Sequence, residues 1–267
     1  MDSAQVGVME NIAGANIEIL RRGKGRTVLF LHPHIGMHGS DAFLSALARD
    51  AQVIAPSHPG FGRSELPRGM TSVDDLSYFY LDLIEELGLR DIVLVGASFG
   101  GWIAAEIAAK TTERVSRLVL IGAVGVKLGE RDRSDILDIF STPRSRWEEL
   151  SFRNPAVWLR DYESLPEEEL IMMARNREST ALFAWNPYMY NPKLRSRLHR
   201  IRIPTLFLWG AHDGFAPLAY GREYCAAIPG AKFEEIADSG HFPHMEQPEA
   251  VARRVIEFGL ERQAAQA

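Results

Sequence analysis

The residues with the clearest chemical potential are a serine among small neighbours, an aspartate and a histidine, which lie far apart along the chain. Ser98 lies in the sequence Gly-Ala-Ser-Phe-Gly, after a run of branched apolar residues. Asp213 also follows a short apolar run, and His241 lies in Ser-Gly-His-Phe-Pro. A serine hydroxyl becomes a nucleophile when a histidine accepts its proton, and an aspartate can orient that histidine. These residue types predict acyl transfer through a covalent intermediate.

The neighbours of Ser98 favour a tight turn from a strand into a helix. The pattern Gly-x-Ser-x-Gly follows an expected strand at 92–95 and precedes an expected helix at 102–109. A serine on such a turn has strained backbone angles, so the residues two positions away must be small, as Gly96 and Gly100 are. The pentapeptide alone is only moderately specific, and its position between a strand and a helix favours a nucleophile turn over a structural loop.

Short apolar runs alternate with amphipathic stretches along most of the chain. Runs bounded by Gly or Pro predict buried strands at 27–31, 53–55, 92–95, 118–121 and 205–209. Outer strands are expected at 17–20 and 233–236, and helices at 73–87, 102–109 and 248–258. This order predicts an α/β fold with a mostly parallel central sheet and helices on both faces. The loops after parallel strands gather at one edge, so Ser98, Asp213 and His241 are expected to converge there.

The alternation stops between residues 125 and 198. Helical patterns follow one another there at 136–140, from 142, at 155–162, from 164 and after 192. Residues 164–167 have the spacing of a capping box. We therefore expect an α/β core made of residues 1–124 and 199–267, with a helical cap inserted at 125–198. The alternative is an extension that only packs on the core.

Composition excludes several classes of protein. The 267 residues include 30 Lys and Arg against 35 Asp and Glu, a net charge of −5, which argues against a nucleic-acid partner. The single cysteine, Cys225, allows no intrachain disulfide. We see no signal peptide and no apolar run near the ~20 residues that a membrane helix requires. We expect a cytoplasmic protein with a small-molecule substrate and no membrane partner, and the sequence leaves its oligomeric state open.

Several segments together resemble the α/β-hydrolase fold superfamily, in particular its capped serine hydrolases of the carboxylesterase type. They are Leu-His-Pro-His at 31–34, His-Pro-Gly-Phe-Gly-Arg-Ser at 58–64, the turn around Ser98, Trp-Gly-Ala-His-Asp at 209–213 and Gly-His-Phe-Pro at 240–243. The resemblance spans residues 17–258. It implies a catalytic triad of Ser98, Asp213 and His241, with His241 favoured over His244 as the base, and it implies no metal and no organic cofactor.

The resemblance also implies an oxyanion hole built from the backbone N–H groups of Phe99 and His34. The family usually has His-Gly where this chain has His32-Pro33. Proline lacks an N–H and has a fixed φ, so the donor at His34 is kept while the geometry of the loop is changed. The His34 side chain either faces the substrate or is an ordinary loop histidine.

A metal site is the alternative for the histidines at positions 32, 34 and 38. We disfavour it because no carboxylate joins them before Asp41 and because the family uses His32 structurally.

The serine nucleophile favours hydrolysis of carboxylic esters, or of related lactones and thioesters, over the aspartate-based chemistry of some relatives. A second candidate is carbon–carbon bond hydrolysis of dienoate ring-cleavage products. Enzymes of that kind usually have an asparagine in the oxyanion loop and a tryptophan after the catalytic histidine, whereas residues 33–50 lack asparagine here and Phe242 follows His241. A third is a non-catalytic ligand-binding protein on the same fold.

A largely apolar substrate pocket is expected between core and cap. The residues that we predict to contact the substrate are Trp185, Tyr188, Trp147 and Phe242. The alternative is that these aromatic side chains only form the core of the cap. Arginines in the cap could bind a substrate carboxylate or could form a solvated surface, namely Arg131, Arg144, Arg146, Arg153 and Arg160.

Overall fold

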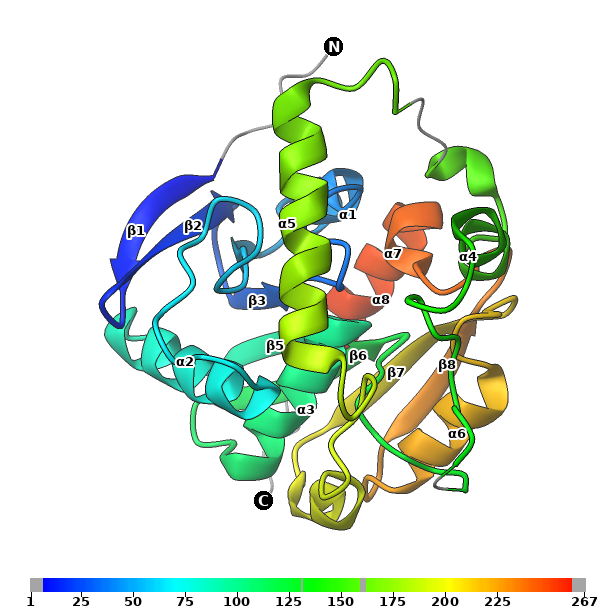
Figure 1. Ribbon diagram of the computed structural model, residues 1–267. Helices are drawn as coiled ribbons and strands as arrows, with labels where there is room; N and C mark the ends of the chain where they lie inside the picture. The colour runs from blue at the N-terminus through cyan, green and yellow to red at the C-terminus, as the bar shows by residue number, and fades with distance from the viewer. Residues whose placement is uncertain (1–6, 131, 159–161, 261–267) are drawn as a thin grey trace.

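The computed structural model describes residues 7–130, 132–158 and 162–260, and its strands form one eight-stranded sheet (Figure 1). The strands are β1 (Val8–Ile12), β2 (Ala15–Arg22), β3 (Thr27–Leu31), β4 (Gln52–Pro56), β5 (Ile92–Ala97), β6 (Val115–Ile121), β7 (Thr205–Gly210) and β8 (Lys232–Ile236). Their order is β1-β2-β4-β3-β5-β6-β7-β8. β2 pairs antiparallel with β1 and β4, and every other pair is parallel. The predicted α/β fold is confirmed.

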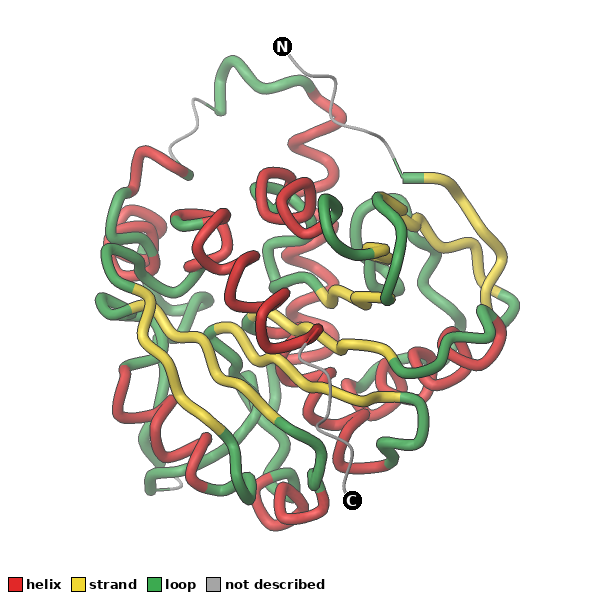
Figure 2. The backbone as a smooth tube through the Cα atoms, turned by 180° about the vertical axis from the view of Figure 1, so that it is seen from behind, coloured by secondary structure: helices red, strands yellow, loops and turns green. Residues whose placement is uncertain are grey.

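Helices cover both faces of the sheet (Figures 1 and 2). They are α1 (Asp41–Leu47), α2 (Val73–Glu86), α3 (Phe99–Lys110), α6 (Leu218–Ala226), α7 (Pro243–Glu246) and α8 (Pro248–Leu260). Side chains alternate along β3, so that Leu29 and Leu31 pack with α2 and α3, whereas Val28 and Phe30 pack with α1 and α8. Within the described part of the chain, no helix has both the length and the apolar character that crossing a bilayer requires.

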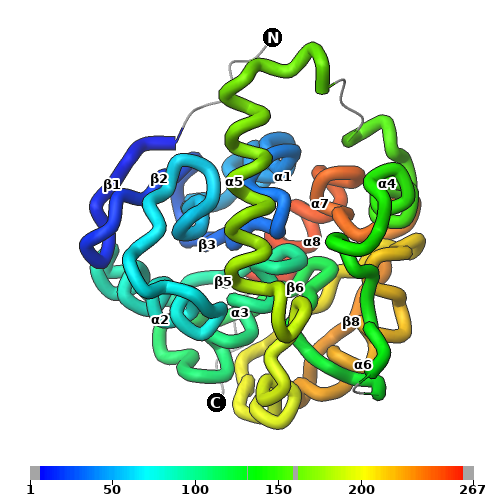
Figure 3. Tube along the Cα trace, in the orientation of Figure 1, coloured from blue at the N-terminus to red at the C-terminus, as the bar shows by residue number. Residues whose placement is uncertain are grey.

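The segment between β6 and β7, which includes the expected insertion at 125–198 and is called the inserted segment below, contains helices. They are α4 (Arg144–Ser151), the 3-10 turn η1 (Pro155–Val157), α5 (Glu167–Ala184) and the 3-10 helix η2 (Arg195–Arg200). In Figures 1 and 3 the long helix α5 crosses in front of the sheet. Among the described residues of this segment, the β-pairing is a single bridge between Gly125 and Tyr190. The segment therefore contributes no strand to the sheet over those residues.

The helix expected at 136–140 is wrong, because the chain there forms turns. A tyrosine from farther along the chain provides hydrogen bonds in place of helical ones. The Tyr188 hydroxyl donates to the Leu137 carbonyl at 2.6 Å and accepts from the Ile139 N–H at 2.9 Å. The Asp138 carboxylate accepts from the Phe140 N–H at 2.8 Å. Side chains thus satisfy main-chain groups that a helix would have paired internally.

Two other expectations in the inserted segment also differ from the structure. Helix α5 begins at Glu167 after Pro166 and has no side-chain hydrogen bond at its N-cap, so the capping box at 164–167 is not formed. The helix expected at 155–162 is limited to the short turn Pro155–Val157, and residues 159–161 lie outside the described part of the chain.

Candidate active site

Ser98 occupies a tight turn between β5 and α3. Its backbone angles, φ 49° and ψ −112°, are unfavourable for a residue with a side chain. A Cβ at Gly96 would overlap the Gly100 carbonyl, and a Cβ at Gly100 would overlap the Leu31 carbonyl of the neighbouring strand. The two glycines therefore let the turn form against β3, which is the steric requirement that the sequence pattern indicates.

The structure brings Ser98, His241 and Asp213 together. His241 Nε2 lies 2.8 Å from Ser98 Oγ, and His241 Nδ1 lies 2.8 Å from Asp213 Oδ2. Asp213 Oδ1 accepts from the N–H groups of Phe215 and Ala216 at 2.9 and 2.7 Å, which fixes the carboxylate. An ionised carboxylate only accepts, so His241 donates its Nδ1 proton to Asp213 and presents the Nε2 lone pair to the serine hydroxyl.

Helix α4 of the inserted segment holds the loops that carry Asp213 and His241. The last carbonyls of a helix have no partner within it. Here the Ser151 carbonyl accepts from the His241 N–H at 2.7 Å, and the Leu150 carbonyl accepts from the Gly214 N–H at 3.0 Å. A side chain at position 240 would overlap the Ser151 carbonyl, so Gly240 permits this approach. The inserted segment therefore contributes to the geometry of the site.

The two predicted oxyanion donors come from separate parts of the chain, Phe99 from the start of α3 and His34 from the loop between β3 and α1. Among the described residues, no protein acceptor pairs with the backbone N–H of Phe99 or of His34. In the loop that carries His34, the side chain of His32 faces the core. It donates its Nδ1 proton to the Pro33 carbonyl at 2.7 Å, and its Nε2 accepts from the His58 N–H at 2.9 Å. Burial lowers the pKa of His32 to about 4, so the ring is neutral near pH 7 and acts as a structural bridge.

The His34 side chain lies between the catalytic candidates and a cavity, whose wall it forms in part. Its ring is stacked on Phe215 with 5.7 Å between centroids, and Phe215 is stacked on His241 at 4.1 Å. Burial first, then the nearby His241 and Arg177, lowers the pKa of His34 to about 3, which keeps the ring neutral. His34 Nδ1 is buried without a hydrogen-bond partner in the described structure. A neutral imidazole therefore stands on the cavity wall beside the catalytic candidates.

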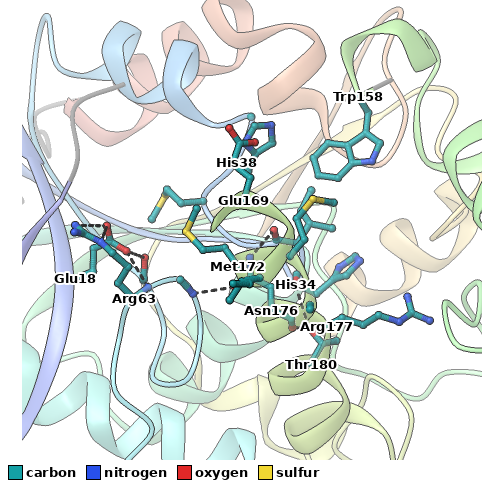
Figure 4. Close-up of a pocket in the computed structure, with 18 of the residues that line it drawn as sticks. Glu18, His34, His38, Arg63, Trp158, Glu169, Met172, Asn176, Arg177 and Thr180 are labelled. Carbon is teal, nitrogen blue, oxygen red and sulfur yellow. Dashed lines mark hydrogen bonds and ion pairs between the residues drawn. The ribbon is translucent and has the colours of Figure 1, made fainter. Parts of the chain in front are cut away.

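The cavity has a volume of about 1350 Å³ and runs between the sheet edge and α5 (Figure 4). Its wall is mostly apolar and includes Leu44, Met37, Ile171, Met172, Met173, Trp147 and Trp158. Figure 4 shows His34, Asn176 and Thr180 close together in one region, with the ion pair of Arg63 and Glu18 in another. An apolar cavity with a few grouped polar side chains is typical of a small-molecule site.

Of the four predicted substrate contacts, the structure places Trp147 on the cavity wall. Trp185 is 60% exposed and packs on Phe140, and the Tyr188 hydroxyl is bonded to main-chain groups. Phe242 is buried beside His241. None of these last three side chains lines the cavity.

Side chains of α5 that sequence reasoning missed do line it, among them Met172, Asn176, Arg177 and Thr180. No sequence motif identifies these residues. Which side chains of α5 face the cavity depends on the rotation of the helix about its own axis.

The remaining candidates from the sequence are His244, the five arginines of the inserted segment and the possible metal site. His244, the competing base, is buried near Phe30 and Phe43. Two of the five arginines pair with glutamates of the same helix, Arg144 with Glu148 and Arg146 with Glu149, and Arg144 also lines the cavity. Positions 131 and 160 lie outside the described residues. Among the residues that are described, no three His, Cys, Asp or Glu side chains are grouped as a metal site would require.

Comparison with known proteins identifies the family of this chain and other proteins that share its fold. Residues 28–254 match the model of the alpha/beta hydrolase family. The chain is 27% identical over 288 residues to a 2-hydroxy-6-oxononadienedioate/2-hydroxy-6-oxononatrienedioate hydrolase of Paraburkholderia phymatum, with 96% of this chain and 95% of that protein covered.

Two solved structures share the architecture. A meta-cleavage product hydrolase from Pseudomonas fluorescens has a TM-score of 0.77 at 22% identity, with 96% of this chain and 98% of that chain covered. An esterase from Thermogutta terrifontis has a TM-score of 0.75 at 24% identity, with 96% and 98% covered. At these identities the likeness shows the fold alone, and two different hydrolytic activities share it.

Proposed function

Because the chain belongs to the alpha/beta hydrolase family, we propose that this hydrolase is a serine hydrolase whose triad is Ser98, His241 and Asp213. The observation that carries the proposal is the pair of 2.8 Å hydrogen bonds that His241 makes, one to the serine hydroxyl and one to the aspartate carboxylate. A hydroxyl, a base and a group that orients the base in this geometry are the requirements for an activated serine nucleophile.

In the proposed reaction, Ser98 Oγ attacks the carbonyl carbon of a carboxylic ester while His241 Nε2 takes the hydroxyl proton. The backbone N–H groups of Phe99 and His34 stabilise the negative charge on the carbonyl oxygen. His241 then gives its proton to the departing alcohol, which leaves an acyl-enzyme. Water attacks the acyl-enzyme with His241 again as the base, and this step releases the acid and restores Ser98. Asp213 stabilises the imidazolium in both steps.

The proposed substrates are esters, or related lactones and thioesters, with a largely apolar fragment. The large cavity with methionine and tryptophan side chains on its wall supports this choice. Ser98 and His241 are each 1% exposed, so the reaction takes place away from bulk water. We further propose that the segment 125–198 acts as the cap over this site.

A second candidate is hydrolysis of a carbon–carbon bond in a dienoate ring-cleavage product. The relative from Paraburkholderia phymatum, which is named as a hydrolase of that chemical class, favours it. Arg177 also lines the cavity, near His34. Its guanidinium is a cation of the kind that binds carboxylates. The missing loop asparagine and the presence of Phe242 after His241 favour ester hydrolysis.

Labelling and turnover test the proposal together. A fluorophosphonate probe is expected to label the wild-type protein and to leave Ser98→Ala unlabelled. A panel of aryl esters, lactones, thioesters and a dienoate is expected to show turnover of short to medium acyl esters, abolished in Ser98→Ala. Preferred turnover of the dienoate would select the second candidate. An unlabelled, inactive wild-type protein would favour a ligand-binding function.

A further inference from the structure

Helix α5 packs on the core through a row of polar side chains. Asn176, Ser179 and Thr180 are 8%, 5% and 1% exposed, and their spacing places them on one side of the helix. Their partners include main-chain groups of two loops, the β3–α1 loop (residues 32–40) and the β4–α2 loop (residues 57–72). A helix normally buries an apolar stripe. In α5 the apolar residues Phe183 and Ala184 are also buried in the core, so the polar bonds add to an apolar contact of this helix.

Asn176 uses both ends of its carboxamide to join the two loops (Figure 4). Its Nδ2 donates to the Ile35 carbonyl at 3.2 Å, and its Oδ1 accepts from the Gly62 N–H at 2.9 Å. Gly36 has a φ of 88°, and a Cβ there would overlap the Asn176 amide. The glycine therefore allows the helix to approach the β3–α1 loop closely enough for the amide to bond.

The β3–α1 loop is thus held from two sides. On the core side, His32 donates to the Pro33 carbonyl at 2.7 Å. On the side of α5, the Thr180 hydroxyl shares its proton between the His34 carbonyl at 3.0 Å and the carbonyl of residue 176 at 2.7 Å. The His34 N–H lies in the same peptide plane as the Pro33 carbonyl, so the His32 bond sets its direction directly. Thr180 and Asn176 fix the carbonyls of the next two peptide planes, those of His34 and Ile35.

We propose that Asn176 and Thr180 are positioning residues that hold the β3–α1 loop so that the His34 N–H points at the developing oxyanion. This proposal rests on the proposed serine hydrolase function. Neither residue is assigned a contact with the reacting atoms, so their loss weakens stabilisation of the transition state more than binding of the substrate. Misplacing such a group by about 1 Å can cost on the order of a hundredfold in rate.

Two near-isosteric substitutions, Asn176→Leu and Thr180→Val, remove these polar contacts. Ser179→Ala is the matched control, because the Ser179 hydroxyl lies in the same row but donates to the Gly60 carbonyl of the other loop at 2.7 Å. The measurements are kcat and KM for an aryl ester and the affinity for a trifluoromethyl ketone, which forms an oxyanion on the serine. We expect kcat and ketone affinity to fall together by about ten- to hundredfold, with KM within about twofold. Ser179→Ala is expected to change none of the three.

The outcomes separate this proposal from the one on which it rests. A wild-type protein that is neither labelled by fluorophosphonate nor active refutes both. An active wild type whose folded variants keep its kcat and ketone affinity refutes the positioning role alone, as does a rise in KM at unchanged kcat. An equal loss in Ser179→Ala would also overturn it, because α5 would then act only by covering the cavity. If Asn176→Leu fails to fold, Thr180→Val carries the test.

Discussion

His244 makes the fold sensitive to acid in a way that one substitution can isolate. Its ring is fully buried near Phe30, Phe43 and Phe242, and neither ring nitrogen has a hydrogen-bond partner in the described structure. Burial, with the nearby His241 as a smaller cause, lowers the pKa of His244 from 6.5 to about 3. The folded protein therefore excludes a proton that the unfolded chain binds below pH 6.5.

The size of the effect follows from that difference. Above pH 6.5 the ring is neutral in both states and contributes no pH dependence. Between pH 6.5 and 3 the unfolded state binds more protons, so the free energy of unfolding falls by about 1.4 kcal/mol per pH unit as the pH is lowered. From pH 7 to pH 5 the loss due to His244 is roughly 2 kcal/mol. His32 and His34 add losses of the same sign.

Urea unfolding followed by tryptophan fluorescence at pH 7, 6 and 5 measures the effect. His244→Leu is expected to lose about 2 kcal/mol less than the wild type between pH 7 and 5, because the other buried histidines are present in both proteins. His199→Leu, at an exposed position, is the matched control and is expected to behave as the wild type. If the wild type and His244→Leu lose stability in parallel, His244 is not held neutral by burial.

Three further predictions concern the site. Asp213→Asn removes the carboxylate that orients His241, so kcat for an ester is expected to fall by about 10⁴-fold. A fall of less than tenfold in steady-state assays would contradict the role assigned to Asp213. Gly100→Ala forces a Cβ against the Leu31 carbonyl, so fluorophosphonate labelling of Ser98 is expected to be lost, and full labelling would show that the turn tolerates a side chain. Trp147→Ala is expected to raise KM by about tenfold, whereas Trp185→Ala, at an exposed position, is expected to leave KM unchanged, and equal effects would refute the assignment of the cavity wall.

The core strands could be predicted because both of their faces are buried. β3 is found at Thr27–Leu31, the range that its apolar run predicts. β1 was not predicted, since it is an edge strand that pairs only with β2 and leaves Val8 and Met9 66% and 42% exposed. An edge strand needs no continuous apolar run, so hydropathy alone gives no signal for it.

Helix α6 shows a different reason for a missed element. Gly221 lies in its middle, and a glycine there lowers the intrinsic stability of a helix by about 1 kcal/mol. The structure needs the glycine because a Cβ would lie 2.7 Å from the Trp209 ring of β7. Close packing of the helix on the sheet overrides the local propensity, and a single sequence does not reveal that packing.

The positions of Ser98, Asp213 and His241 could be predicted from topology, whereas most of the cavity wall, apart from Trp147, could not, and α5 shows why. Ile171 and Leu182 are 58% and 41% exposed on this helix, while Thr180 is 1% exposed. Hydrophobic periodicity assumes that the buried face meets an apolar core. Here Phe183 meets the apolar core, but the rest of the buried face meets main-chain carbonyls and N–H groups, which only polar side chains can pair. The row of buried polar side chains in α5 therefore reflects its contact with loop backbone near the candidate site, which hydrophobic periodicity does not reveal.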